Sequence, residues 1–140
     1  MSIGELMVHG LWNYAIKAVD IDETADFYVK HMAGQLRLRG EVFGCKYIFV
    51  RLGDSRLLIF DKAPYEEEHG MNLPPGFLHL VYEVDDFEKH VEMLREADVQ
   101  WLMEPQEIEL ELGRRKIAFF VDPNGIRTEV MQIIEDRSTV

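Results

Sequence analysis

The chain has almost no cysteine, since Cys45 is the only one among 140 residues. A single thiol cannot form an internal disulfide, so nothing in the sequence favours an oxidising compartment. Long apolar runs are also missing, and no stretch approaches the roughly 18 residues that a membrane span needs. The opening residues, MSIGELMVHG, lack the basic stretch and apolar core of a secretory signal. These absences predict a soluble, cytoplasmic protein with no membrane partner.

Positive charge is scarce as well. The chain has 15 Lys and Arg residues against 26 Asp and Glu residues, for a formal net charge of -11. Such a charge opposes the neutralisation of phosphates that drives nucleic-acid binding, so we expect no nucleic-acid partner. The length suits a single domain with a real hydrophobic core, and we expect residues 1–140 to form one domain.

An internal repeat is the strongest pattern in the sequence. Residues 13–28 lie over residues 79–94 at a constant offset of 66, and each copy opens with an apolar strand-like run that ends in aspartate. The pairs Asp20-x-x-Glu23 and Asp85-x-x-Glu88 resemble capping boxes, in which a side-chain oxygen accepts from free amides of the first helical turn. The apolar spacing that follows predicts helices at about 22–33 and 86–97.

After each predicted helix the apolar period changes from 3.6 to 2, which is typical of strands. Each half therefore reads as β-α-β-β-β. Module one covers about 10–63, an acidic connector about 64–76, and module two about 77–133. A unit of this kind buries only one face of its sheet, so the two copies should share a core or enclose a cavity. The strands predicted after the helices are Gln35–Glu41, Lys46–Leu52, Ser55–Phe60, Val99–Met103 with Glu107–Leu112, Lys116–Val121 and Arg127–Ile133.

One dense positive cluster, residues 114–116, follows a strand in which Glu107, Glu109 and Glu111 alternate with apolar residues. The alternation is typical of a strand with one solvated face. We expect the cluster to form ion pairs with these glutamates, although it also suits an anionic substrate.

The duplicated β-α-β-β-β unit, the Phe27-Tyr28 pair and the ending DPNGIRTEV at 122–130 resemble the vicinal oxygen chelate superfamily. That group includes glyoxalase I, methylmalonyl-CoA epimerase, extradiol dioxygenases and the fosfomycin and bleomycin resistance proteins. The resemblance covers about residues 10–133. It implies an α+β fold of two tandem βαβββ modules, whose sheets curve openly around a cavity, and a homodimer that takes a small-molecule substrate or ligand.

In this family a divalent metal sits inside the cavity, on up to four strand positions. Carried over to this chain, the positions are Asn13, Leu58, His79 and Glu129. His79 and Glu129 suit zinc, iron, manganese, nickel or cobalt. Asn13 stands where a histidine is usual and is a weaker ligand, and Leu58 cannot coordinate a metal. The implied site is therefore His79, Glu129 and, weakly, Asn13.

Each of these residues also has a structural interpretation. A lone histidine in an apolar strand, such as His79, is often a hydrogen-bonded core residue. Asn13 can equally be a polar side chain bonded to the backbone. A carboxylate in a predicted central strand, such as Glu129, is costly to bury without a cation or a proton, which favours a functional role.

Three hypotheses follow from the resemblance. The first is a metal-dependent lyase or isomerase of the glyoxalase type, in which Glu129 shuttles a proton beside a carbonyl and the metal stabilises an enediolate. The second is an extradiol-type ring-cleaving dioxygenase, because such enzymes use three ligand positions. The third is a metal-free protein of the bleomycin-resistance type that binds a small molecule, because two of the four positions are lost.

Overall fold

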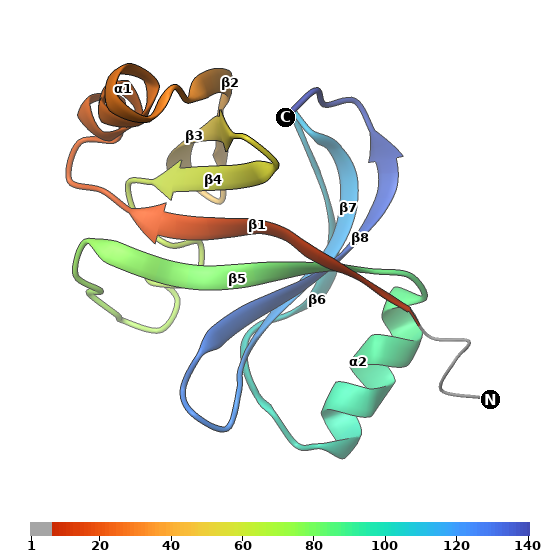
Figure 1. Ribbon diagram of the computed structural model, residues 1–140. Coiled ribbons are helices and arrows are strands. Elements are labelled where there is room, and N and C mark those ends of the chain that lie inside the picture. The colour runs from red at the N-terminus through yellow and green to blue at the C-terminus, as the bar shows by residue number, and fades with distance from the viewer. Residues whose placement is uncertain (1–6) are drawn as a thin grey trace. The chain divides into compact units, whose positions relative to one another are not determined.

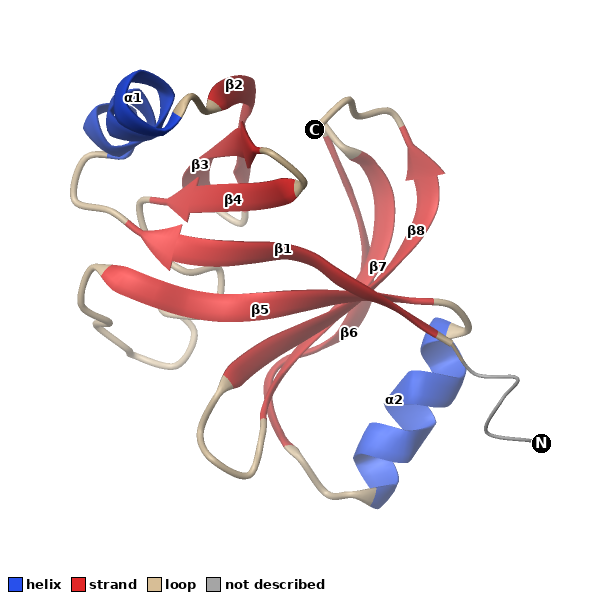
Figure 2. Ribbon diagram, viewed as in Figure 1, coloured by secondary structure: helices blue, strands red, loops and turns tan. Residues whose placement is uncertain are grey.

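The computed structural model describes residues 7–140, which form two βαβββ modules of the α+β class, as predicted (Figure 1). Figure 2 separates the helices and strands by colour. Neither described helix is long and apolar enough to cross a membrane. Module one has the elements β1 (Val8–Lys17), α1 (Ile21–Met32), β2 (Gln35–Val42), β3 (Cys45–Leu52) and β4 (Ser55–Phe60). Module two has β5 (Gly76–Val84), α2 (Phe87–Glu96), β6 (Gln100–Leu110), β7 (Gly113–Val121) and β8 (Arg127–Asp136).

The two modules have the same strand order and the same register. Module one runs β2-β3-β4-β1 and module two runs β6-β7-β8-β5, with the first strand of each module parallel to its last. Ala15 pairs with Leu58 in module one, and Val81 pairs with Glu129 in module two. Ala15 and Val81 are 66 residues apart, so the sequence repeat is a repeat of structure. Leu58 and Glu129 consequently hold equivalent positions.

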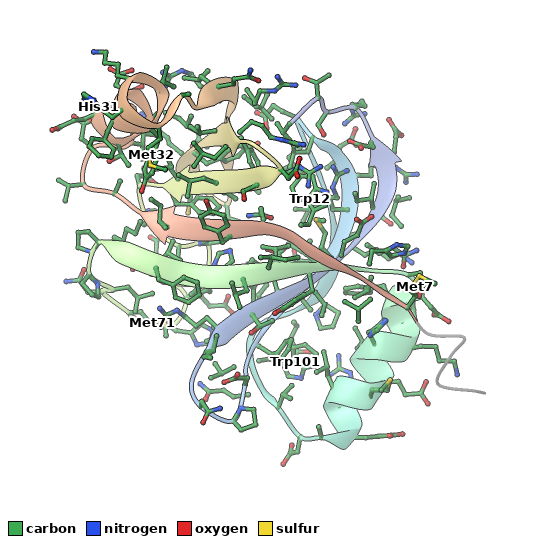
Figure 3. All side chains as sticks on the ribbon, in the orientation of Figure 1. Met7, Trp12, His31, Met32, Met71 and Trp101 are labelled. Carbon is green, nitrogen blue, oxygen red and sulfur yellow. The ribbon has the colours of Figure 1, made fainter. Side chains whose placement is uncertain are left out.

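By their contacts the residues form two compact units, and β1 and β5 contribute to both. One unit is Asn13–His79 with Ser138–Val140, and the other is Leu80–Arg137 with residues 7–12. In the first unit, α1 packs one face of the strands through Ala25 against a cluster that includes Ile48 and Ile59. In the second, Phe87 of α2 packs with Ala118 and Val130, and Trp101 lies against this cluster (Figure 3). Each module thus uses one sheet face for its helix and leaves the other for different contacts.

One of the two predicted helix caps is wrong by a residue. Asp20 caps α1 and accepts a hydrogen bond from the Glu23 amide at 3.0 Å, as predicted. The cap of α2 is Asp86, not Asp85, because β5 extends to Val84 and Asp85 is hydrogen-bonded to Met7 through both its amide and its side chain. Asp86 lies 66 residues after Asp20. The repeat itself therefore indicated the correct cap, and the Asp-x-x-Glu spacing misled.

Strand β6 runs without a break through Pro105, where two separate segments were predicted. It has a neighbour on one side only, and its register with β7 shifts between Trp101 and Met103 and again between Met103 and Gln106. Proline is tolerated at such an edge because its missing amide hydrogen is not needed for a ladder. The turn into β7 ends at Gly113, whose φ of +120° and close approach to the Glu135 carbonyl leave no room for a side chain.

The glutamates of β6 are solvated, as predicted, since Glu107 and Glu109 are exposed. The cluster at 114–116 divides into two parts. Arg114 pairs with Glu107 at 3.4 Å and Lys116 pairs with Glu88 of α2, whereas Arg115 is buried. The expected local pairing therefore holds for Arg114, and Arg115 belongs to the interior.

Candidate functional site

All three expected ligands are buried polar side chains. Asn13 and His79 lie in the unit that contains module one's strands, with exposed fractions of 3% and 0%. Glu129 lies in the other unit and is 9% exposed. Leu58, at the position equivalent to Glu129, is buried as an ordinary apolar residue. Burying polar groups of this kind is costly and calls for specific partners or a function.

His79 is held between aromatic rings on the face of the unit away from α1. The ring centroids of Phe60 and Tyr65 lie 6.2 Å and 5.6 Å from the imidazole centroid. The hydroxyl oxygen of Tyr65 is 2.9 Å from Nδ1 of His79 and 3.3 Å from the main-chain oxygen of Leu78. The imidazole is therefore fixed in orientation by a residue of the connector, which the sequence did not single out.

The connector is anchored in the same unit by Glu66. This carboxylate accepts from Lys17 Nζ at 2.9 Å and 3.2 Å, and from the amides of Ala63 at 3.1 Å and Leu73 at 2.8 Å. Lys17 Nζ also donates to the main-chain oxygen of Leu73 at 2.7 Å. The side chains of Lys17 and Glu66 are 15% and 5% exposed. One member of the acidic Glu66-Glu67-Glu68 run thus folds the connector inward, next to Tyr65.

Glu129 lies between apolar neighbours in the sheet. Its strand partners are Val81 on β5 and Phe119 on β7, which are both buried. Burial raises the pKa of Glu129 from its ordinary 4.5 to about 8, and the positive charge of Arg115 acts in the opposite direction. Desolvation is the larger influence, so in the metal-free protein the carboxyl group holds its proton at neutral pH.

Arg115 supplies the positive charge in this unit, and its role escaped the sequence reasoning because it stands between two surface cations. It is 1% exposed, and its guanidinium lies over the ring of Trp12 at 5.8 Å. It donates to the main-chain oxygen of Glu135 at 2.8 Å and to Asp136 Oδ1 at 3.3 Å. Trp12, one residue before the repeat, is labelled in Figure 3. The alternation along β7 places Arg115, Ile117 and Phe119 on one face, which is the signal that the sequence carried.

The three side chains named by the resemblance each carry a donor atom for a metal ion. Within residues 7–140, no group of three or more His, Cys, Asp and Glu side chains is placed to hold a metal. The resemblance adds an amide donor, and the Asn13 side chain is buried with its Nδ2 lacking a hydrogen-bond partner among the described residues. Because amide oxygen and nitrogen are interchanged by a half-turn of the group, this side chain can present its oxygen to a cation. By their chemistry the amide oxygen of Asn13 and the imidazole of His79 in one unit, and the carboxylate of Glu129 in the other, are donors that a divalent ion accepts, and Leu58 offers none.

The raised pKa of Glu129 predicts a pH-dependent stability in chelator-treated protein. The native state holds this proton up to about pH 8 and the unfolded state only up to about 4.5. The stabilisation is therefore complete below pH 4.5 and is lost as the pH rises to 8, by at most about 1.4 kcal/mol per pH unit. Urea unfolding of the wild type and of Glu129→Gln across this range measures it. The wild type should lose stability relative to the variant as the pH rises, and a constant difference would contradict the prediction.

Comparison with solved structures places the fold among known ones. A hypothetical protein from Bacillus halodurans C-125 is 20% identical, with a TM-score of 0.71 over 92% of this chain and 97% of that one. Methylmalonyl-CoA epimerase from Mycobacterium tuberculosis is 19% identical, with a TM-score of 0.69 over 89% and 88% of the two chains. A variant of the Streptomyces coelicolor epimerase in complex with 2-nitronate-propionyl-CoA is 19% identical, with a TM-score of 0.70 over 94% and 99%. At these identities the likeness shows the fold.

Sequence comparison identifies the family. No curated protein sequence matches this chain significantly. The family model described as Glyoxalase/Bleomycin resistance protein/Dioxygenase superfamily matches residues 11–130, nearly the whole described chain. This match agrees with the resemblance to vicinal oxygen chelate proteins carried by the repeat and by the ending at 122–130. The chain therefore belongs to the Glyoxalase/Bleomycin resistance protein/Dioxygenase superfamily.

Proposed function

We propose that this protein is an isomerase or lyase that moves a proton on the carbon beside a carbonyl group of a small molecule. Glu129 would be the residue that accepts and returns the proton. His79, Glu129 and Asn13 would hold a divalent metal ion. The observation that carries the proposal is the burial of these polar side chains at strand positions where the superfamily places its metal, with Glu129 set between Val81 and Phe119.

The chemistry suits a buried carboxyl group. A group that transfers a proton works best when both of its forms are accessible near the working pH. Burial favours the protonated form of Glu129, and the charge of Arg115 favours the ionised form. A bound divalent ion, when present, would polarise the carbonyl and so make the neighbouring C–H bond more acidic. Glu129 is buried between the strand partners Val81 and Phe119, and low exposure to water would strengthen its interaction with a substrate.

The metal content of the protein tests this proposal. Protein purified without an affinity tag, added metal or chelator is analysed by elemental mass spectrometry, and we expect about one divalent ion per chain, by analogy with other three-ligand catalytic sites. The same protein in D2O is then assayed by NMR for deuterium uptake beside the carbonyl of methylmalonyl-CoA and of a thiohemiacetal of a 2-oxoaldehyde. Chelation should stop any exchange. Absence of both metal and exchange would contradict the proposal.

A second function is favoured by Leu58. Leu58 has no donor atom at a position where the superfamily has a metal ligand. The buried rings of Tyr47, Phe49 and Phe60 lie on the same sheet face of module one as Leu58. A face of this kind also suits a metal-free protein that binds an apolar or aromatic compound. The metal analysis separates the two functions, because only the first requires a stoichiometric ion.

A further inference from the structure

The connector residue Tyr65 makes two hydrogen-bond contacts with a single hydroxyl group. Its oxygen is 3.3 Å from the main-chain oxygen of Leu78 and 2.9 Å from Nδ1 of His79. Tyr65 and His79 both have an exposed fraction of 0%. The hydrogen bonds among these three groups depend on which of them carries a hydrogen.

A tyrosine hydroxyl carries one hydrogen, and a main-chain carbonyl oxygen can only accept. The two contacts are satisfied together in one way: Tyr65 donates its hydrogen to Leu78, and Nδ1 of His79 carries a hydrogen that it donates to Tyr65. A neutral imidazole has one N–H group and one bare nitrogen. With the hydrogen on Nδ1, the lone pair of His79 lies on Nε2.

We infer that Tyr65 is a positioning residue that fixes His79 in the Nδ1–H tautomer and so presents the lone pair of Nε2 for metal binding or proton transfer. The inference rests on the proposed function for its purpose, and it deepens it by adding a residue from the connector. Partners of this kind set both the tautomer and the ring orientation of histidines that bind metals.

The hydroxyl of Tyr65 is held in place by the surrounding chain. The next residue, Glu66, is bonded to Lys17 on β1 and to the amides of Ala63 and Leu73, which close the connector on both sides of Tyr65. The Tyr65 ring also packs against the imidazole, with centroids 5.6 Å apart. A side chain fixed in this way keeps its hydroxyl at one distance from Nδ1, which a loop tyrosine on a free linker would not do.

The variant Tyr65→Phe tests the inference, because it keeps the ring and removes only the hydroxyl. The readout is the NMR spectrum of imidazole ¹⁵N nuclei in metal-free protein, at a pH where the ring is neutral, which reports which nitrogen carries the hydrogen. We expect the hydrogen on Nδ1 in the wild type and a shift of population toward Nε2–H in the variant. Zn²⁺ affinity, measured by competition with a chelating dye, should fall about 10- to 100-fold, as for other partners of metal-bound histidines.

Tyr28→Phe is the matched control, since Tyr28 lies on α1 and its ring contacts Phe27. It should leave both the His79 spectrum and the Zn²⁺ affinity unchanged. A wild-type spectrum with the hydrogen on Nε2 would overturn the inference even if Tyr65→Phe failed to fold. So would an unchanged tautomer in a folded Tyr65→Phe variant. If the tautomer is as expected and no metal binds, the proposed function fails and the inference about Tyr65 stands.

Discussion

Replacing Glu129 by glutamine is expected to slow the exchange of a substrate hydrogen with solvent by about 100- to 10,000-fold, the usual contribution of a positioned acid or base. Glutamine has nearly the same shape and cannot take up or release the proton. Because Glu129 is protonated at neutral pH in the metal-free protein, the neutral amide should cost little stability at pH 7. The measurement is deuterium uptake by NMR with whichever compound the wild type exchanges.

The control is Glu111→Gln, which removes a carboxylate of the same size from the exposed end of the β6 turn. It should leave the exchange rate within about twofold, as expected for a change at an exposed side chain. The thermal midpoints of both variants show whether they are folded. A folded Glu129→Gln variant that exchanges hydrogen at the wild-type rate would remove Glu129 from the mechanism.

Glu66→Gln is expected to produce the largest loss of stability, about 3–5 kcal/mol, because it leaves the largely buried Lys17 side chain, 15% exposed, without its carboxylate. In the wild type the Glu66 carboxylate accepts from the amides of Ala63 and Leu73. The variant replaces one of its acceptor oxygens by an NH2 donor, so one of these amides loses its acceptor. The free energy of unfolding in urea measures the loss. His79 should be affected as well, since the connector that carries Tyr65 is then released.

Glu67→Gln is the natural comparison, because Glu67 is the next residue and pairs with Lys62 on the surface at 3.4 Å. Exposed pairs contribute roughly 0–1 kcal/mol, so this variant should be nearly as stable as the wild type. The double variant Lys17→Met with Glu66→Gln should recover part of the loss, because it removes the stranded charge. Equal losses of unfolding free energy in Glu66→Gln and Glu67→Gln would contradict the prediction, because the Lys17–Glu66 pair would then stabilise the protein no more than an exposed pair.

Local patterns predicted the elements well because each depends on residues close in sequence. Asp20 and the amide it caps are three residues apart, and the apolar period along a strand or helix is read within a few turns. The failure at Asp85 has a different origin. Its pairing with Met7 joins residues that are 78 positions apart, and such a pairing decides where β5 ends and α2 begins.

In each of two charged runs of the sequence, the structure buries one residue and leaves its neighbours nearer the surface. Of three successive glutamates in the connector, Glu66 is buried in an ion pair, whereas Glu67 and Glu68 are exposed. Of three successive cations at 114–116, Arg115 is the buried one. A run of like charges gives no local sign of which member turns inward, because that depends on partners such as Lys17 and Trp12 on distant strands.

The sequence by itself determined the two βαβββ modules, through its apolar periods and a repeat at constant offset, and the ending of nine residues at 122–130 carried the resemblance to the superfamily. That resemblance in turn predicted Asn13, His79 and Glu129 as ligand positions. Only the tertiary structure decided that Tyr65 bonds to His79, that Glu66 anchors the connector and that Arg115 acts on Glu129. The physical reason is that hydrogen bonds and desolvation act through space, so the proton positions of a buried site are set by neighbours that the chain brings in from elsewhere.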